Sequence, residues 1–101
     1  MKKLDQAKKL LGLANRARKV TLGMSGTSNS IKKGQCQLLI LTMDISSNTR
    51  AKIAAAAEER KVRILTCGSK DEFGQIFGRA EVAIIGVEDA GFARALQEIL
   101  G

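Results

Sequence analysis

The chain of 101 residues has the length of one domain, is 45% hydrophobic and carries a net charge of +7 at neutral pH. A chain of this size can build one hydrophobic core without disulfides or metals. It contains no histidine and two distant cysteines, Cys36 and Cys67, which we expect to be reduced thiols. Because the commonest metal ligand and general base are absent, we expect no metal, no cofactor and no catalytic residue.

The composition also bears on location. No apolar run approaches about 20 residues, so no segment is expected to span a membrane. Asp5, Lys8 and Lys9 interrupt the apolar residues near the N-terminus, which argues against a signal peptide. We therefore expect a cytoplasmic protein. We also expect residues 1–101 to form a single domain and the protein to be a monomer.

Positive charge is concentrated in the first third of the chain. Residues 1–33 carry nine Lys or Arg and one acid, whereas residues 34–101 carry eight basic and nine acidic residues. Such an asymmetry indicates a polyanionic partner, either a nucleic acid or an anionic membrane surface. A basic face that is merely solvated is the alternative.

The first half of the chain opens with an amphipathic pattern. Apolar residues recur at helical spacing from Leu4 to Ala14, which predicts a helix over residues 3–17. A short strand over residues 20–22 should follow, and then a weak helix over residues 23–33 that Gly34 closes. The near-continuous apolar run of residues 37–42 is typical of a strand covered on both faces.

The second half continues the alternation. Ser46 or Ser47 should cap a helix over residues 48–61, and a strand over residues 62–66 comes next. Ser69 and Glu72 fit a capping box that starts a helix over residues 70–77, which Gly78 ends. A buried strand over residues 82–87 and a helix over residues 90–100, capped by Asp89, complete the chain. The alternation predicts an α/β fold, a three-layer α/β/α sandwich with a four-stranded mixed, largely parallel sheet.

The segment from Gly23 to Gly34 is the candidate binding site. A helix that opens with small polar residues leaves its first backbone N–H groups free, and its dipole favours an anion there. An ordinary helix cap followed by a surface helix is the alternative. The surrounding cations favour the anion site, and we select these candidate contact residues: Arg16, Arg18, Lys19, Gly23, Ser25, Gly26, Asn29, Lys32, Lys33 and Arg79.

Several fragments resemble one known family. The N-terminal fragment is Leu10-Leu11-Gly12-Leu13-Ala14-x-Arg16-Ala17-x-Lys19-x-x-x-Gly23. The later fragments are Leu38-x-Ile40-Leu41-x-x-Asp44-x-Ser46-x-Asn48-Thr49, Phe73-Gly74-x-x-x-Gly78 and Asp89-x-Gly91-Phe92-Ala93. Together they resemble the small bacterial YlxQ-type members of the ribosomal protein L7Ae family over nearly the whole chain.

The resemblance implies an α/β/α sandwich that binds structured RNA, in many members the kink-turn, and an association with the ribosome. It places the RNA face on the helix that starts at Gly23 and on the loop before the last strand, where Arg79 lies. The family motif reads Gly-Thr-Asn-Glu, with a Lys three residues after the Glu. Here Ser25, Gly26 and Asn29 replace its Asn, Glu and Lys. The residues that position the RNA backbone are therefore kept, and those that read bases are largely lost.

Three functions compete. The first is a non-catalytic, ribosome-associated protein that binds structured RNA such as ribosomal RNA or a kink-turn. With three Phe and no Trp or Tyr, base stacking cannot be its main mode. The second is a small nucleotide- or phosphate-binding protein that uses the Gly23–Gly26 loop, although this loop matches neither standard nucleotide-binding motif. The third, attachment to anionic lipid through the first helix, is weaker because its apolar residues are explained by a core.

Overall fold

Helices and strands alternate along the chain in the predicted order. The computed structural model describes residues 2–101. Its helices are α1 (Lys3–Arg16), α2 (Gly23–Lys32), α3 (Ser47–Glu59), α4 (Lys70–Phe77) and α5 (Ala90–Leu100). Its strands are β1 (Val20–Leu22), β2 (Leu38–Leu41), β3 (Arg63–Thr66) and β4 (Ile84–Val87). Every element begins and ends within two residues of its predicted boundary.

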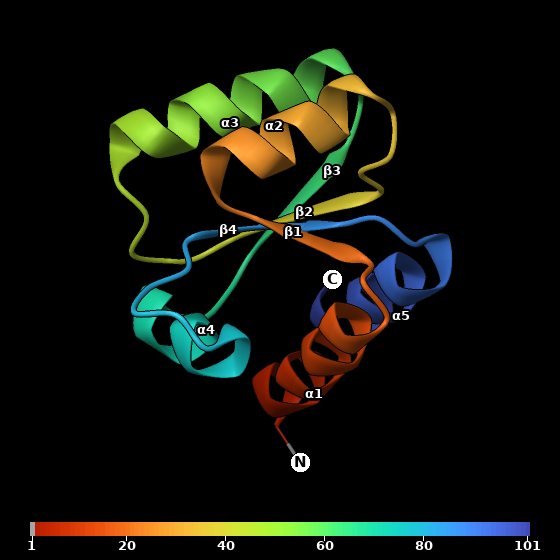
Figure 1. The fold of residues 1–101 in the computed structure, drawn as a ribbon, viewed down its shortest axis with the longest axis vertical. Helices are drawn as coiled ribbons and strands as arrows, with labels where there is room; N and C mark the ends of the chain where they lie inside the picture. Colours follow the sequence, from red (N-terminus) through yellow and green to blue (C-terminus); the bar gives the residue numbers. More distant parts are fainter. Residues whose placement is uncertain (1) are drawn as a thin grey trace.

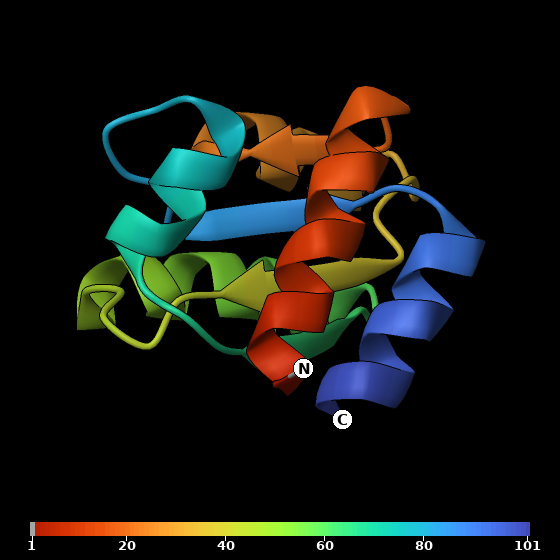
Figure 2. The same cartoon turned by 90° about the horizontal axis from the view of Figure 1, so that it is seen from below.

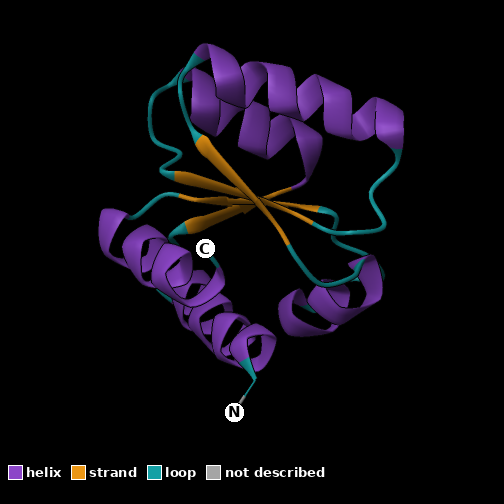
Figure 3. Ribbon diagram, turned by 180° about the vertical axis from the view of Figure 1, so that it is seen from behind, coloured by secondary structure: helices purple, strands orange, loops and turns teal. Residues whose placement is uncertain are grey.

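The elements form three layers, as predicted. Figure 1 shows the sheet nearly edge-on, with α2 and α3 on one face and α1, α4 and α5 on the other. The view from behind shows the same arrangement, with the strands fanned between two layers of helices (Figure 3). None of the helices within residues 2–101 has the length and hydropathy to cross a bilayer.

The strand side chains divide the core into two clusters. Leu38 and Ile40 of β2 point toward α1, α4 and α5, whereas Leu39 and Leu41 point toward α2 and α3. This alternation follows from the two-residue repeat of a strand. Ala7 and Leu11 of α1 are buried in the first cluster, and Leu4 and Leu10 pack against it, so the core accounts for most of the apolar residues of this helix without a lipid surface; Leu13 is the exposed exception.

The direction of the strands corrects one prediction. The sheet order is β1-β4-β2-β3, and β2 with β3 is the one parallel pair of neighbours; β4 runs antiparallel to both β1 and β2. The sheet is mixed, as expected, but two of its three pairs of neighbouring strands are antiparallel, so the pairing is not largely parallel. The error arose because β2 and β4 are apolar throughout, and that pattern reports helices on both faces of the sheet rather than the direction of the strands.

Local capping confirms most of the predicted helix ends. The side chains of Ser46, Ser69 and Asp89 accept hydrogen bonds from the third residue of α3, α4 and α5, respectively. Gly78 ends α4 with φ +69°, and Gly34 follows α2 with φ +74°. Both glycines adopt a left-handed conformation that other residues rarely adopt, which explains how these helices stop.

A glycine in the central sheet lets α2 approach β4 closely. A β-carbon at Gly86 would lie 2.5 Å from Thr21 Oγ1 and 2.9 Å from Thr27 Cγ2. The hydroxyls of these two threonines are 3.1 Å apart and hydrogen-bonded, which links β1 to α2. Gly86 and the threonine pair therefore fix the position of α2 on the sheet.

Both cysteines are free thiols, as expected. Cys36 is buried and Cys67 is half-buried. Burial raises the pKa of each thiol above the ordinary value for a cysteine. They therefore stay protonated at neutral pH and act as small apolar side chains.

Candidate nucleic-acid interface

The N-terminal end of α2 is open to solvent. Gly23 begins the helix with φ +82°, and Leu22 at the N-cap makes no side-chain capping hydrogen bond. Gly23, Ser25 and Gly26 are all exposed. The first turn contains no acidic residue. The backbone N–H groups and the positive end of the helix dipole are therefore available to an anion, in contrast to α3, α4 and α5, which side chains cap.

Close packing is not the reason why the first turn of α2 has a glycine at position 26. A β-carbon built at Gly26 would meet only Thr21 Cβ, at 3.9 Å, which is ordinary van der Waals contact. The backbone at Gly26 therefore does not exclude a β-carbon, and the glycine is not required by close packing. What this turn presents is backbone N–H groups and the Ser25 hydroxyl.

The loop before β4 lies at the same end of the sheet as this helix tip. In the antiparallel pair of β1 and β4, Leu22 is opposite Ile85, so the chain enters α2 where the 78–83 loop enters β4. Figure 2 shows the arrowhead of β1 directed toward the side on which this loop lies. Arg79 is exposed in the loop. The structure therefore brings Arg79 to the same end as Gly23, Ser25 and Gly26.

Close packing on α4 holds the loop in place. A β-carbon at Gly74 would lie 2.7 Å from the carbonyl oxygens of both Arg79 and Ala80. The backbone N–H of Arg79 donates to the Gly74 carbonyl at 2.8 Å, and that of Val82 donates to the Lys70 carbonyl at 3.1 Å. Gly74 therefore permits the approach that these hydrogen bonds stabilise.

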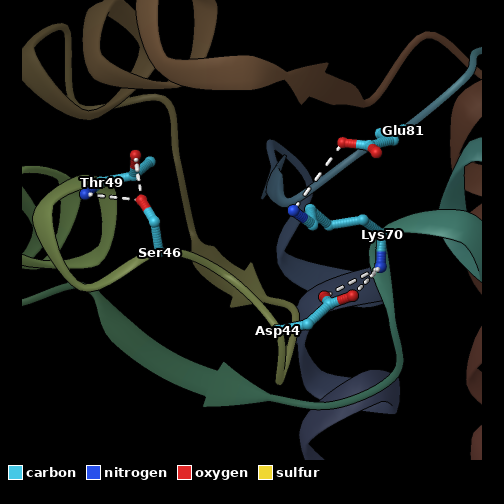
Figure 4. A network of polar contacts seen from close by, with 5 residues as sticks. All are labelled: Asp44, Ser46, Thr49, Lys70 and Glu81. Carbon is cyan, nitrogen blue, oxygen red and sulfur yellow. Dashed lines mark hydrogen bonds and ion pairs between the residues drawn. The ribbon is translucent and has the colours of Figure 1, made fainter.

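A polar network connects this loop to its neighbours (Figure 4). The backbone N–H of Lys70 donates to Asp44 Oδ1 at 3.0 Å, and Lys70 Nζ lies 3.8 Å from Glu81 Oε2. In the adjacent segment, the backbone N–H of Thr49 donates to Ser46 Oγ at 3.3 Å. Asp44 follows β2, Lys70 begins α4 and Glu81 precedes β4, so one network joins three segments at the same end of the sheet.

An exposed ridge runs along α2 from its tip. We call the residues Ser25, Gly26, Asn29, Lys32 and Lys33 the α2 ridge; all five are exposed. They recur at three- and four-residue spacing and therefore share one face of the helix. Ten residues of α-helix span about 15 Å. The ridge thus connects the neutral tip, with its free N–H groups, to a basic C-terminal end.

Two more candidate residues lie at the basic end of the ridge. Arg18 and Lys19 line a shallow hollow of about 230 Å³ together with Gln35 and Glu88. Glu88 accepts a hydrogen bond from Ser30 Oγ of α2 at 2.6 Å. These contacts place Arg18 and Lys19 beside the end of α2, at the opposite end of β1 from the tip.

Arg16 is the candidate that stands apart. It lines a groove between α1 and α4, on the other face of the sheet from α2 (Figure 1). The structure therefore does not gather every predicted cation around the helix tip. It brings Gly23, Ser25, Gly26 and Arg79 together at one end, extends the surface along the ridge, and places Arg18 and Lys19 at the other end.

Sequence reasoning missed some of the residues that form this end of the molecule. Met43 follows β2 and is 76% exposed, which is unusual for a large apolar residue. Asp44 stands in one of the family-like fragments, but only the folded chain brings it together with Lys70 and Glu81. Gly74 stands in one of the family-like motifs, but its role in seating the loop is visible only in three dimensions.

The fold and this surface define a small, basic α/β/α sandwich protein whose exposed helix face suits a polyanion. The chain belongs to the ribosomal protein L7Ae/L30e/S12e/Gadd45 family, whose sequence profile matches residues 5–97. The resemblance inferred from the sequence motifs is therefore confirmed.

Relatives support this assignment. The RNA-binding protein YlxQ of Bacillus subtilis (strain 168) is 37% identical over 91 residues, which are 90% of this chain and 91% of that protein. The RNA-binding protein YlxQ of Enterococcus faecium is 28% identical over 96 residues, 95% of this chain and 92% of that protein.

Solved structures confirm the fold. A protein of unknown function from Bacillus halodurans superimposes with a TM-score of 0.88 at 32% identity, covering 93% of this chain and 95% of that one. The Giardia lamblia 15.5kD RNA binding protein superimposes with a TM-score of 0.76 at 17% identity, covering 97% of this chain and 83% of that one. At that identity the second match shows the shared fold alone.

Proposed function

We propose that this chain is a non-catalytic protein that binds structured RNA through the tip of α2, the 78–83 loop and the α2 ridge. The observation that carries the proposal is an uncapped, exposed helix tip continuous with an exposed ridge that ends in Lys32 and Lys33. Family membership and two relatives named as RNA-binding proteins support the class of partner.

In this proposal the RNA backbone follows the ridge. A phosphate accepts hydrogen bonds from the first N–H groups of α2, beside the Ser25 hydroxyl. The ammonium groups of Lys32 and Lys33 then neutralise phosphates farther along the RNA backbone. Arg18 and Lys19 lie at the end of this path. Arg79 contacts phosphate from the neighbouring loop. These contacts position the RNA and do not identify its bases.

The aromatic residues support structured over single-stranded RNA. Phe73 is fully buried, and Phe77 and Phe92 pack against the same core cluster. Phe77 and Phe92 are only partly accessible, and the chain has no Trp or Tyr, so there is no fully exposed aromatic side chain on which bases could stack. Recognition by shape and backbone is the mode expected for folded RNA, and we propose a kink-turn or another element of ribosomal RNA as the partner.

A small phosphorylated ligand fits the tip less well. Small-molecule sites are usually concave and enclose most of their ligand. Here Gly23, Ser25 and Gly26 are exposed, and they line neither the Arg18 hollow nor the α1–α4 groove. The helix tip is therefore better suited to one phosphate of a long backbone than to a free nucleotide.

A binding titration tests this function. The folded chain is titrated with a kink-turn RNA, with a linear duplex of the same composition and with ATP, at several salt concentrations. If about five phosphates are neutralised, the logarithm of the RNA affinity should fall against the logarithm of salt with a slope of about −4. A clear preference for the kink-turn would support specificity for that fold. Failure to bind either RNA at low salt, or stabilisation by ATP alone, would contradict the proposal.

A further inference from the structure

A groove between α1 and α4 lies on the face of the sheet that α2 does not reach. It forms a hollow of about 420 Å³ lined by Lys8, Lys9, Gly12, Leu13, Arg16 and Ile76. The two helices lie on the same face of the sheet (Figure 2). The groove is therefore separate from the proposed RNA surface.

The centre of the groove is apolar and open. Leu13 is 51% exposed, although its neighbours Leu11 and Ala14 are completely buried. A β-carbon at Gly12 would have no atom within 4 Å, so the missing side chain leaves space rather than relieving a clash. Ile76 of α4 contributes an apolar wall and is half-buried against the core. The groove thus offers an exposed leucine beside an unfilled space.

Cations stand on both sides of this apolar centre. Lys9 and Arg16 are seven residues apart on α1, which corresponds to about 10.5 Å or two helical turns. Both are exposed, and neither forms an ion pair with another residue between positions 2 and 101. The groove is therefore positively charged at its rim and apolar at its centre.

An ion pair joins the two helices that form the groove. Lys8 Nζ donates to Glu72 Oε2 at 2.7 Å across the contact between α1 and α4. This hydrogen bond lowers the pKa of the Glu72 carboxyl below its ordinary value, so the pair stays charged at neutral pH. Glu72 thereby neutralises Lys8, and Lys9 and Arg16 remain free to meet an acidic partner.

We propose that this groove docks an acidic amphipathic helix of a partner protein. Apolar side chains of that helix would contact Leu13 and Ile76, and carboxylates one turn to either side would face Lys9 and Arg16. A phosphodiester backbone has no apolar group to bury against Leu13, and the groove has no aromatic side chain on which a base can stack. The observations therefore favour a protein helix over RNA.

Nuclear magnetic resonance with defined peptides tests the proposal. The probe is a helical peptide of about 18 residues, with leucines along one stripe and glutamates on both flanks. We expect shifts of the amide signals of α1 and α4. A peptide of equal charge with serines in place of the leucines should bind at least about tenfold more weakly, because it loses the apolar anchors. Shifts spread evenly over all basic surfaces, or equal binding of both peptides, would overturn the proposal.

Two variants separate docking from folding. Gly12→Leu adds a side chain whose β-carbon meets no atom within 4 Å, and we expect it to occupy the groove. It should lower the affinity for the leucine peptide about tenfold and raise the melting temperature, since glycine disfavours a helix. Ala55→Leu adds the same side chain at an exposed position of α3 and should leave peptide affinity within about twofold. Both should bind kink-turn RNA like the unmodified chain. The docking proposal would be refuted if Gly12→Leu bound the leucine peptide as tightly as the unmodified chain. It would also be refuted if kink-turn RNA shifted the amide signals of the groove instead of those of α2.

Discussion

Reversing the charge of Lys32 and Lys33 to Glu is expected to lower RNA affinity by about 10- to 100-fold at 0.1 M salt. Each lost phosphate contact removes about 0.9 from the salt slope and is worth up to about tenfold at that salt. The slope should therefore become about two units shallower. The measurement is a set of equilibrium titrations of a kink-turn RNA at several salt concentrations.

A variant with the same change in net charge provides the control. Lys3→Glu combined with Arg94→Glu alters exposed residues of α1 and α5, on the face of the sheet opposite α2. It should change the affinity much less, because it removes only long-range attraction that salt screens. Equal losses in the two double variants would show that net charge, and not the α2 ridge, governs binding. Both should unfold near the temperature of the unmodified chain, since these side chains are exposed.

Gly74→Ala is expected to destabilise the protein by about 1–3 kcal/mol and to weaken RNA binding as well. The added carbon would lie 2.7 Å from two carbonyl oxygens of the 79–80 backbone, which cannot rotate away as a side chain can. The loop must therefore move away from α4, and it takes Arg79 with it. Thermal unfolding followed by circular dichroism measures the first effect, and the RNA titration measures the second.

Gly12→Ala is the matched control for this substitution. Both glycines lie inside helices, but a β-carbon at Gly12 meets no atom within 4 Å. Gly12→Ala should therefore stabilise the protein by up to about 1 kcal/mol, the ordinary gain in helix propensity. If Gly74→Ala kept the stability and RNA affinity of the unmodified chain, the close packing of the loop on α4 would not position Arg79.

The elements were predictable because each has a local signal. Periodic apolar residues mark α1 and α5, serine or aspartate caps mark the starts of three helices, and Gly34 and Gly78 mark two ends. Strand direction had no such signal. The apolar residues of β4 indicate that helices cover both faces of the sheet, and they carry no information on the antiparallel direction of the strand relative to β2.

The site was predictable only in part, for a similar reason. The exposed tip at Gly23 follows from a glycine, small polar residues and a neighbouring strand, which are all local features. Counting charges along the sequence could not show that Arg16 and Arg18, only two residues apart, lie on different surfaces. The helix ends between them, and Arg16 lines the α1–α4 groove while Arg18 lies beside the end of α2.

Mapping the amide signals that shift when a kink-turn RNA is added would show directly whether RNA lies along α2. We expect the largest changes at residues 23–26, in the 78–83 loop and at exposed positions along α2, and we expect them all to weaken as salt is raised. Changes concentrated on α1 and α5, with the signals of residues 23–26 unmoved, would rule out RNA binding at the tip of α2.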